Sequence, residues 1–113
     1  FVMRAFSVAG VTVEWRGAGV EEHGVVGAVR EVDGMLPQCS IGDLVVSVDP
    51  AYFRPTEVES LLGDASRARA ELGWQPRIDF DTLVEEMVHA DLGIARRDRL
   101  VESSGFPTYQ GFE

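Results

Sequence analysis

The sequence predicts a small α+β domain in which three or four helices pack against a short sheet. Amphipathic helix patterns lie towards both ends of the chain, and segments rich in β-branched residues lie between them. With 113 residues, 45% of them hydrophobic, the chain is long enough for one modest core. No apolar run approaches the length of a membrane-spanning helix, and the N-terminus lacks the layout of a signal peptide.

The chain begins with a helical pattern that Gly10 can stop. Its apolar residues recur at helical spacing: Phe1, Val2, Ala5, Phe6 and Ala9. No capping residue precedes them, so we interpret this segment as the last turns of a helix that begins upstream, in a longer polypeptide. Residues 11–15 then alternate apolar and polar side chains, which indicates a half-buried strand.

The middle of the chain combines loops with short strands. The glycines and polar residues of 16–24 predict a loop. Asp33-Gly34 suits a tight turn, with short strands expected at 25–26 and 29–32. Residues 44–49 are the strongest strand pattern, and we expect them to pair with residues 11–15.

The next segment is expected to turn sharply and then to form short helices. Residues 52–55 should form an extended corner, because a residue before proline avoids the helical region. Thr56 can cap a short helix that runs to residue 62. Asp64 can cap a second helix over residues 65–72, which Gly73 would close in the left-handed conformation.

The last helix has the clearest pattern. Either Asp79 or Asp81 can cap it, and Arg96-Arg97 suit the negative end of its dipole. Its apolar stripe consists of Phe80, Leu83, Val84, Met87, Val88, Leu92 and Ala95. We therefore assign residues 1–97 to the domain and residues 98–113 to a polar tail that lies on the surface or is partly disordered.

Composition excludes several classes of function. A net charge of −9 argues against a nucleic-acid-binding protein, and all ten basic residues are arginines, which excludes lysine chemistry from this chain. Cys39 is the single cysteine, so an internal disulfide is impossible and a reducing cytoplasm is expected. His23 and His89 are far apart in sequence, and no metal-site spacing is present. We interpret Cys39 as an apolar filler and both histidines as structural or solvated.

Arg54 and Glu57 are the candidate binding residues. The guanidinium offers a planar fork of donors to phosphate oxygens, and a carboxylate can accept hydrogen bonds from sugar hydroxyls. Pro55 restricts the backbone between them, which lowers the entropy lost on binding. The alternative is an ordinary salt bridge at a helix start, and from spacing alone the salt bridge is favoured.

The order of motifs resembles the C-terminal, substrate-binding part of GDP-mannose 4,6-dehydratases, which belong to the extended short-chain dehydrogenases/reductases. Trp15, Gly17, Gly19, Glu22 and Gly24 fit a W-x-G-x-G-x-x-E-x-G loop of that family. The most characteristic stretch is Tyr52-Phe53-Arg54-Pro55-Thr56-Glu57-Val58, which Leu62-Gly63-Asp64, Leu72-Gly73-Trp74 and Pro76 follow.

The resemblance implies a parent enzyme, a lyase, that converts GDP-mannose to GDP-4-keto-6-deoxymannose with NADP. It implies that Arg54 contacts the diphosphate and Glu57 a ribose hydroxyl, which reverses the preference for the salt bridge. It also implies an N-terminal Rossmann domain with the dinucleotide loop and the catalytic residues, and assembly into homodimers or homotetramers. This chain carries neither the dinucleotide loop nor the catalytic residues of that Rossmann domain. We therefore expect no NADP binding by this chain and no activity of the chain alone.

Two alternatives remain open. A related UDP- or dTDP-sugar epimerase or dehydratase would share the Arg54/Glu57 pair but prefer another base. A non-catalytic interaction module would bind a protein partner and no nucleotide. The expected partners under the leading hypothesis are GDP-mannose and the missing Rossmann domain, with no nucleic acid and no membrane.

Overall fold

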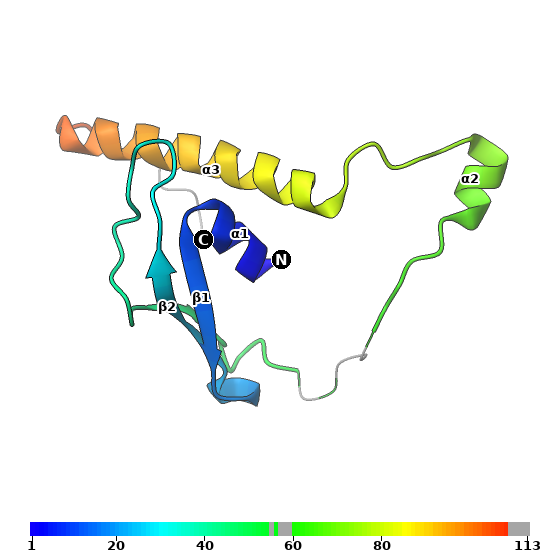
Figure 1. Cartoon of the computed structure of the whole chain (residues 1–113), viewed down its shortest axis with the longest axis horizontal. Coiled ribbons are helices and arrows are strands. Elements are labelled where there is room, and N and C mark those ends of the chain that lie inside the picture. The colour runs from blue at the N-terminus through cyan, green and yellow to red at the C-terminus, as the bar shows by residue number, and fades with distance from the viewer. Residues whose placement is uncertain (55, 57–59, 109–113) are drawn as a thin grey trace.

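Three α-helices and three β-strands make up the described part of the chain (Figure 1). The computed structural model describes residues 1–54, 56 and 60–108. In chain order the elements are α1 Val2–Val8, β1 Val11–Arg16, the 3-10 helix η1 Gly19–Glu21, β2 His23–Val29, β3 Leu44–Ser47, α2 Ser66–Leu72 and α3 Phe80–Ser103. The α+β class predicted from the sequence is confirmed.

The sheet is antiparallel, with β2 between β1 and β3. The predicted pairing of residues 44–49 with residues 11–15 is therefore wrong. The short connection through η1 folds β2 straight back onto β1, with Trp15 opposite Gly24, so β3 adds to the free edge of β2. Gly24 permits close packing at this place, because a Cβ on it would lie 2.7 Å from Cγ1 of Val13.

The expected turn at Asp33-Gly34 is confirmed. Both residues have positive φ, 52° and 75°, and the backbones of Val32 and Met35 exchange two hydrogen bonds of 2.9 and 3.0 Å across them. The strands around it differ from the prediction. β2 begins at His23, inside the predicted loop, and ends at Val29, and beyond it only Val32 and Met35 form an isolated bridge.

The core is built from valine. Helix α1 packs against β1 and α3, so it lies between the sheet and the long helix (Figure 1). The buried apolar side chains of the described residues are Val8, Val11, Val13, Val25, Val26 and Val84. Cys39 packs half-buried against this cluster, which confirms its interpretation as an apolar filler.

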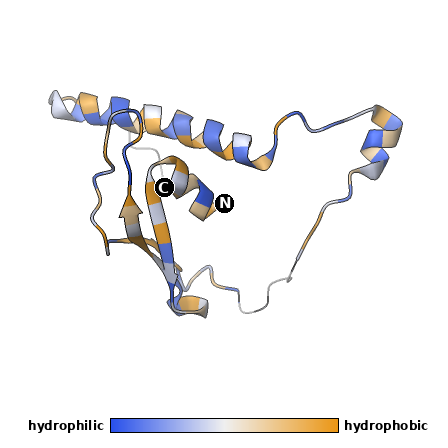
Figure 2. Ribbon diagram, in the orientation of Figure 1, coloured by the Kyte–Doolittle hydropathy of each residue, from blue (hydrophilic) through white to orange (hydrophobic). Residues whose placement is uncertain are grey.

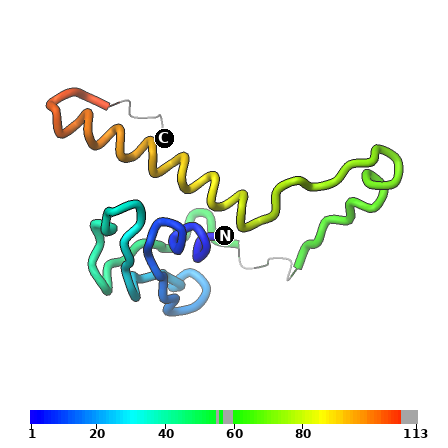
Figure 3. Tube along the Cα trace, turned by 45° about the horizontal axis from the view of Figure 1, so that its top comes forward, coloured from blue at the N-terminus to red at the C-terminus, as the bar shows by residue number. Residues whose placement is uncertain are grey.

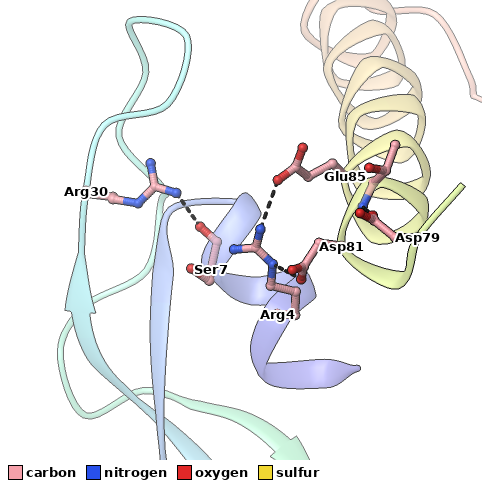
Figure 4. Close-up of polar contacts among 7 residues, drawn as sticks. Arg4, Ser7, Arg30, Asp79, Asp81 and Glu85 are labelled. Atoms are coloured by element: carbon pink, nitrogen blue, oxygen red, sulfur yellow. Dashed lines mark hydrogen bonds and ion pairs between the residues drawn. The ribbon is translucent and has the colours of Figure 1, made fainter.

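Arg4 links α1 to the first turns of α3 (Figure 4). Its Nε donates to Asp81 at 2.7 Å and its Nη2 donates to Glu85 at 2.9 Å. Val84, on the same turns of α3 as Asp81 and Glu85, has a fully buried side chain. Exposed ion pairs contribute at most about 1 kcal/mol, whereas a buried valine contributes about 2 kcal/mol. Apolar packing therefore holds the two helices together, and Arg4 fixes their register.

Helix α3 starts where the sequence predicts and ends later. The Asp79 carboxylate accepts a hydrogen bond from the Thr82 amide at 2.8 Å, so Asp79 rather than Asp81 is the cap. The helix continues past Arg97 to Ser103, so Arg96-Arg97 do not lie in its last turn. Neither glycine nor proline interrupts residues 98–104, and the chain turns only at Gly105, which has a φ of 82°.

Residues 60–78, here called the arm, stand away from the rest of the chain (Figures 1 and 3). The main packing between elements joins α1 to β1 and α3 and joins the strands to one another, and α2 has no part in these main contacts. The radius of gyration is accordingly 18.4 Å, against about 13 Å for a compact domain of this length.

The prediction of a first short helix, from Thr56 to residue 62, is wrong for the residues of this range that the structure describes. Thr56 and residues 60–62 lie outside any helix. Leu61 and Leu62 are more than 90% exposed, so no packing offsets the cost of nucleating a helix. α2 begins at Ser66, after Asp64 accepts a hydrogen bond from the Ser66 amide, and Gly73 closes it with a φ of 61°, as predicted.

Many large apolar side chains remain exposed outside this small core. Hydrophobic residues recur along α3 and on α2 (Figure 2). Met87 and Ile94 on α3 are 45% and 50% exposed, and Trp74 on the arm is 48% exposed. Exposed apolar surface is often the site of contact with another protein surface. Within the described residues, no helix combines the length and the apolarity that crossing a membrane requires.

Val26→Ala is expected to destabilise the fold by about 2 kcal/mol, because the side chain is almost fully buried and a cavity would remain. Val29→Ala, on the same strand but 37% exposed, is the matched control and should cost less than about 0.5 kcal/mol. Urea denaturation measures both. Equal losses would contradict the position of the core.

Asp79 is expected to make α3 sensitive to acid. The hydrogen bond from the Thr82 amide lowers the pKa of Asp79, so the folded state favours the ionised carboxylate. Its stabilising contribution is complete above the ordinary aspartate pKa of about 3.9 and is lost as the pH falls through the lower folded pKa. Thermal denaturation between neutral pH and pH 3 should show a steeper loss of Tm for the wild type than for Asp79→Asn, which keeps a cap that does not titrate. Parallel curves would contradict the capping role.

Candidate functional site

Arg54 follows a tight turn that leads away from β3. The Asp49 carboxylate accepts a hydrogen bond from the Ala51 amide at 2.8 Å, and the Asp49 carbonyl accepts one from the Tyr52 amide at 3.0 Å. Phe53 and Arg54 come next, outside any helix or strand, and the Arg54 side chain is exposed. The predicted corner is thus a turn up to Tyr52 and irregular backbone beyond it.

Glu57 and Pro55 lie outside the described residues. Whether Glu57 stands beside Arg54 remains the prediction made from the sequence. Among the described residues, Arg54 takes part in none of the ion pairs. An exposed guanidinium at the end of a tight turn is well placed to meet an anionic ligand.

Phe53 attaches this segment to the loop between β1 and β2. A Cβ added to Gly19 would lie 3.8 Å from Cζ of Phe53, so the ring lies against this glycine. Phe53 is 40% exposed, whereas its neighbour Tyr52 is 83% exposed. Gly19 has a φ of 60°, a conformation that glycine adopts without strain. The loop therefore supports the backbone immediately before Arg54.

The loop itself is held closed. Gly17 has a φ of 76° and lies so close to the Glu21 carbonyl that a Cβ would clash with it. The His23 ring donates a hydrogen bond from Nδ1 to the same carbonyl at 2.8 Å. This contact assigns a structural role to His23, as expected. The glycines that the sequence places here thus allow a closely packed loop beneath Phe53.

A pocket of about 440 Å³ opens between this loop and β3. Aliphatic side chains form most of its wall, and two carboxylates, an imidazole and a hydroxyl add polar groups. Its lining consists of Val20, Glu21, Glu22, His23, Val25, Leu44, Ser47 and Val48. Sequence reasoning missed this pocket. The one signal in the sequence is that residues 44–48 directly precede the turn that leads to Arg54.

The other residues considered in the sequence lie elsewhere. His89 lines a small pocket of about 210 Å³ with Arg4 and Arg30, whose guanidinium donates to the Ser7 carbonyl at 2.6 Å (Figure 4). Trp15 is 38% exposed at the end of β1. In the described part of the chain, no three histidine, cysteine or acidic side chains gather as a metal site.

Known proteins similar to this chain share one description. The sequence model of a family described as GDP-mannose 4,6 dehydratase matches residues 1–87. A GDP-mannose 4,6-dehydratase of Yersinia enterocolitica is 41% identical over 106 residues, which is 94% of this chain and 28% of that protein. Relatives of the same name from Vibrio cholerae and Homo sapiens are 46% and 42% identical over 96 residues, 85% of this chain and 25% and 23% of theirs. The chain thus spans about a quarter of the length of these relatives.

Gly19→Val is expected to displace Phe53 and with it Arg54, since the added methyl groups would enter the space of the ring. Gly34→Val is the matched control, because Gly34 also has positive φ but has open space around its Cα. Both variants should lose about 1–2 kcal/mol to backbone strain in urea denaturation. Only the first should shift the NMR signals of residues 52–54. Unchanged signals in Gly19→Val would show that the loop does not support this segment.

Proposed function

The chain belongs to the GDP-mannose 4,6-dehydratase family, and from this premise we propose that it is the C-terminal, substrate-binding portion of such an enzyme. The proposed parent enzyme is a lyase that converts GDP-mannose to GDP-4-keto-6-deoxymannose. The observation that carries the proposal is the family match over residues 1–87, which includes both the supporting loop and Arg54.

We propose that Arg54 binds the diphosphate of the GDP-sugar and that Glu57 accepts a hydrogen bond from a ribose hydroxyl. The guanidinium is exposed, and the backbone before it is held by the Asp49–Tyr52 turn and by the contact of Phe53 with Gly19. In a chain of net charge −9, an anionic ligand depends on such a local arginine. Arg54 would supply binding energy and register, holding the hexose in position for reaction.

The NADP that the parent enzyme would use does not fit this chain. Within the described residues the sheet is wholly antiparallel, and the chain contains no lysine. A dinucleotide site of the Rossmann type needs a parallel βαβ unit with a glycine-rich turn before a helix. We therefore propose that a separate Rossmann portion of the parent binds NADP and supplies the catalytic groups, and that this chain alone is inactive.

Other parts of the parent enzyme would cover the exposed apolar surface. The arm and the outer side of α3 expose Leu72, Trp74, Met87 and Ile94. We propose that the Rossmann portion packs on part of this surface and that the parent enzyme assembles as a homodimer or homotetramer. The single cysteine agrees with the cytoplasmic location that we propose for it.

A nucleotide titration tests the proposal. NMR spectra of the 113-residue chain with GDP and, separately, UDP should show GDP-selective shifts at residues 52–58. Arg54→Ala should weaken GDP binding at least about tenfold, because a charged hydrogen-bond donor to phosphate is removed. Arg69→Ala, on α2 and distant from this segment, is the control and should leave binding unchanged.

A stronger response to UDP than to GDP would favour the related UDP-sugar enzymes instead. A folded chain that responds to neither nucleotide would contradict the proposed function and favour an interaction module.

A further inference from the structure

Helix α3 carries two apolar faces, and within the described part of the chain only one of them is covered. The covered face lies against α1 (Figure 1): Val84 is fully buried, and Val88 and Leu92 line a hollow with Phe6. The second face, here called the seam, lies roughly 130° away around the helix, at 3.6 residues per turn. Its members, each at least partly exposed, are Leu83, Met87, Ala90, Ile94 and Val101. The single apolar stripe expected from the sequence therefore divides between two faces.

The seam has the spacing of helices that pair with one another. Its residues follow at alternating intervals of four and three from Leu83 to Ile94, and Val101 continues the repeat after Arg97 takes one position. Side chains that recur about every 3.5 residues pack into the holes of a facing helix. Gly93, next to the seam, is a second indication. Glycine weakens a helix interior, yet a Cβ at this position would meet nothing within 4 Å, so the space beside it is open to a close neighbour.

The charges along the seam decide how a second α3 can lie against it. In a parallel pair, Arg97 would face the Arg97 of the second copy and Glu86 would face its Asp91, so both contacts would repel. In an antiparallel pair centred on the middle of α3, Arg97 instead lies over Met87 of the second copy and beside its Glu86, and symmetry makes this attractive contact twice. Arg97 now pairs only with its exposed neighbour Asp98, a contact that costs little to exchange.

The antiparallel arrangement also matches the sizes of the side chains. Ile94 then faces Ala90 of the second copy, and Val101 faces its Leu83, so the apolar layers combine large side chains with smaller ones. One contact opposes the pairing, because Asp91 meets its own counterpart near the twofold axis. The seam is therefore complementary to itself in spacing, in size and in the charge of its arginine, with one like-charge contact.

We propose that the seam binds the seam of a second copy of this chain, with the two α3 helices antiparallel and their Gly93 residues facing each other at the axis. This surface serves the homodimer proposed for the parent enzyme and leaves the arm to the Rossmann portion. It does not depend on nucleotide binding at Arg54, so either proposal can fail without the other. One pair of helices is a small interface, and a dissociation constant on the order of tens of micromolar is expected.

Sedimentation equilibrium of the 113-residue chain tests the surface. The mass should rise from 12.4 kDa towards twice that value as the concentration passes through this range. Ile94→Glu should weaken association at least about tenfold, because each copy would bury an unpaired charge. Asp91→Asn should strengthen it about twofold or more, because the like-charge contact is removed. Ile41→Glu, the same change as at Ile94 but at a residue that is 73% exposed and outside α3, is the matched control and should leave the mass curve unchanged.

Crosslinking tests the direction of the helices. In a Cys39→Ala background, Gly93→Cys should give a covalent dimer with a short bifunctional thiol reagent, because the two copies of residue 93 meet at the axis. Leu100→Cys should not, because the two thiols would lie roughly 20 Å apart at 1.5 Å per residue. A dimer crosslinked at residue 100, or none at residue 93, would overturn the antiparallel pairing. A mass of 12.4 kDa at every concentration, or a dimer that Ile94→Glu leaves intact, would overturn the surface itself.

Discussion

The packing of α1 against the first turns of α3 is the contact on which the rest of the structure depends. It joins the first helix of the chain to the last, across the whole sheet and the arm. Val84 is fully buried in it, and Arg4 reaches Asp81 and Glu85 at 2.7 and 2.9 Å on its rim. Because exposed ion pairs are worth little, the valine supplies the free energy and the arginine the register. This contact ties α3 to the part of the domain that carries the sheet.

That frame positions the candidate site through β1 and β2. The strands continue directly from α1, and their connecting loop is closed by Gly17, η1 and the His23 hydrogen bond. Phe53 lies against this loop at Gly19, so the segment before Arg54 is held from the side of the sheet. The site is thus assembled from two stretches, residues 17–23 and 44–54. The closed loop therefore supports the backbone that leads to Arg54.

The sequence predicted those features whose cause is local. Gly10 ends α1, Asp79 caps α3, Gly73 closes α2, and Asp33-Gly34 forms a turn with positive φ, because each depends on one residue and its neighbours. The strand order was not predictable in this way. It depends on how tightly the loop after β1 turns, and that in turn depends on the closeness of Gly17 to Glu21 and of Gly24 to Val13. The prediction of a short helix after Thr56 was also wrong over the described residues. Leu61 and Leu62 are exposed, so no tertiary packing offsets the cost of nucleating a helix there.

The candidate site was predicted only in part for the same reason. Arg54 was recognisable from its residue type and the proline after it, and Glu57, outside the described residues, stays a prediction. The pocket beside Arg54 could not be found, because it is formed by β3 and a loop that is distant in sequence. The central claim is that this chain itself holds a guanine nucleotide at Arg54. A crystal structure of the chain with GDP tests it most directly. The account predicts diphosphate oxygens within hydrogen-bond distance of the Arg54 guanidinium. GDP bound at another surface, with Arg54 turned away from it, would contradict the account.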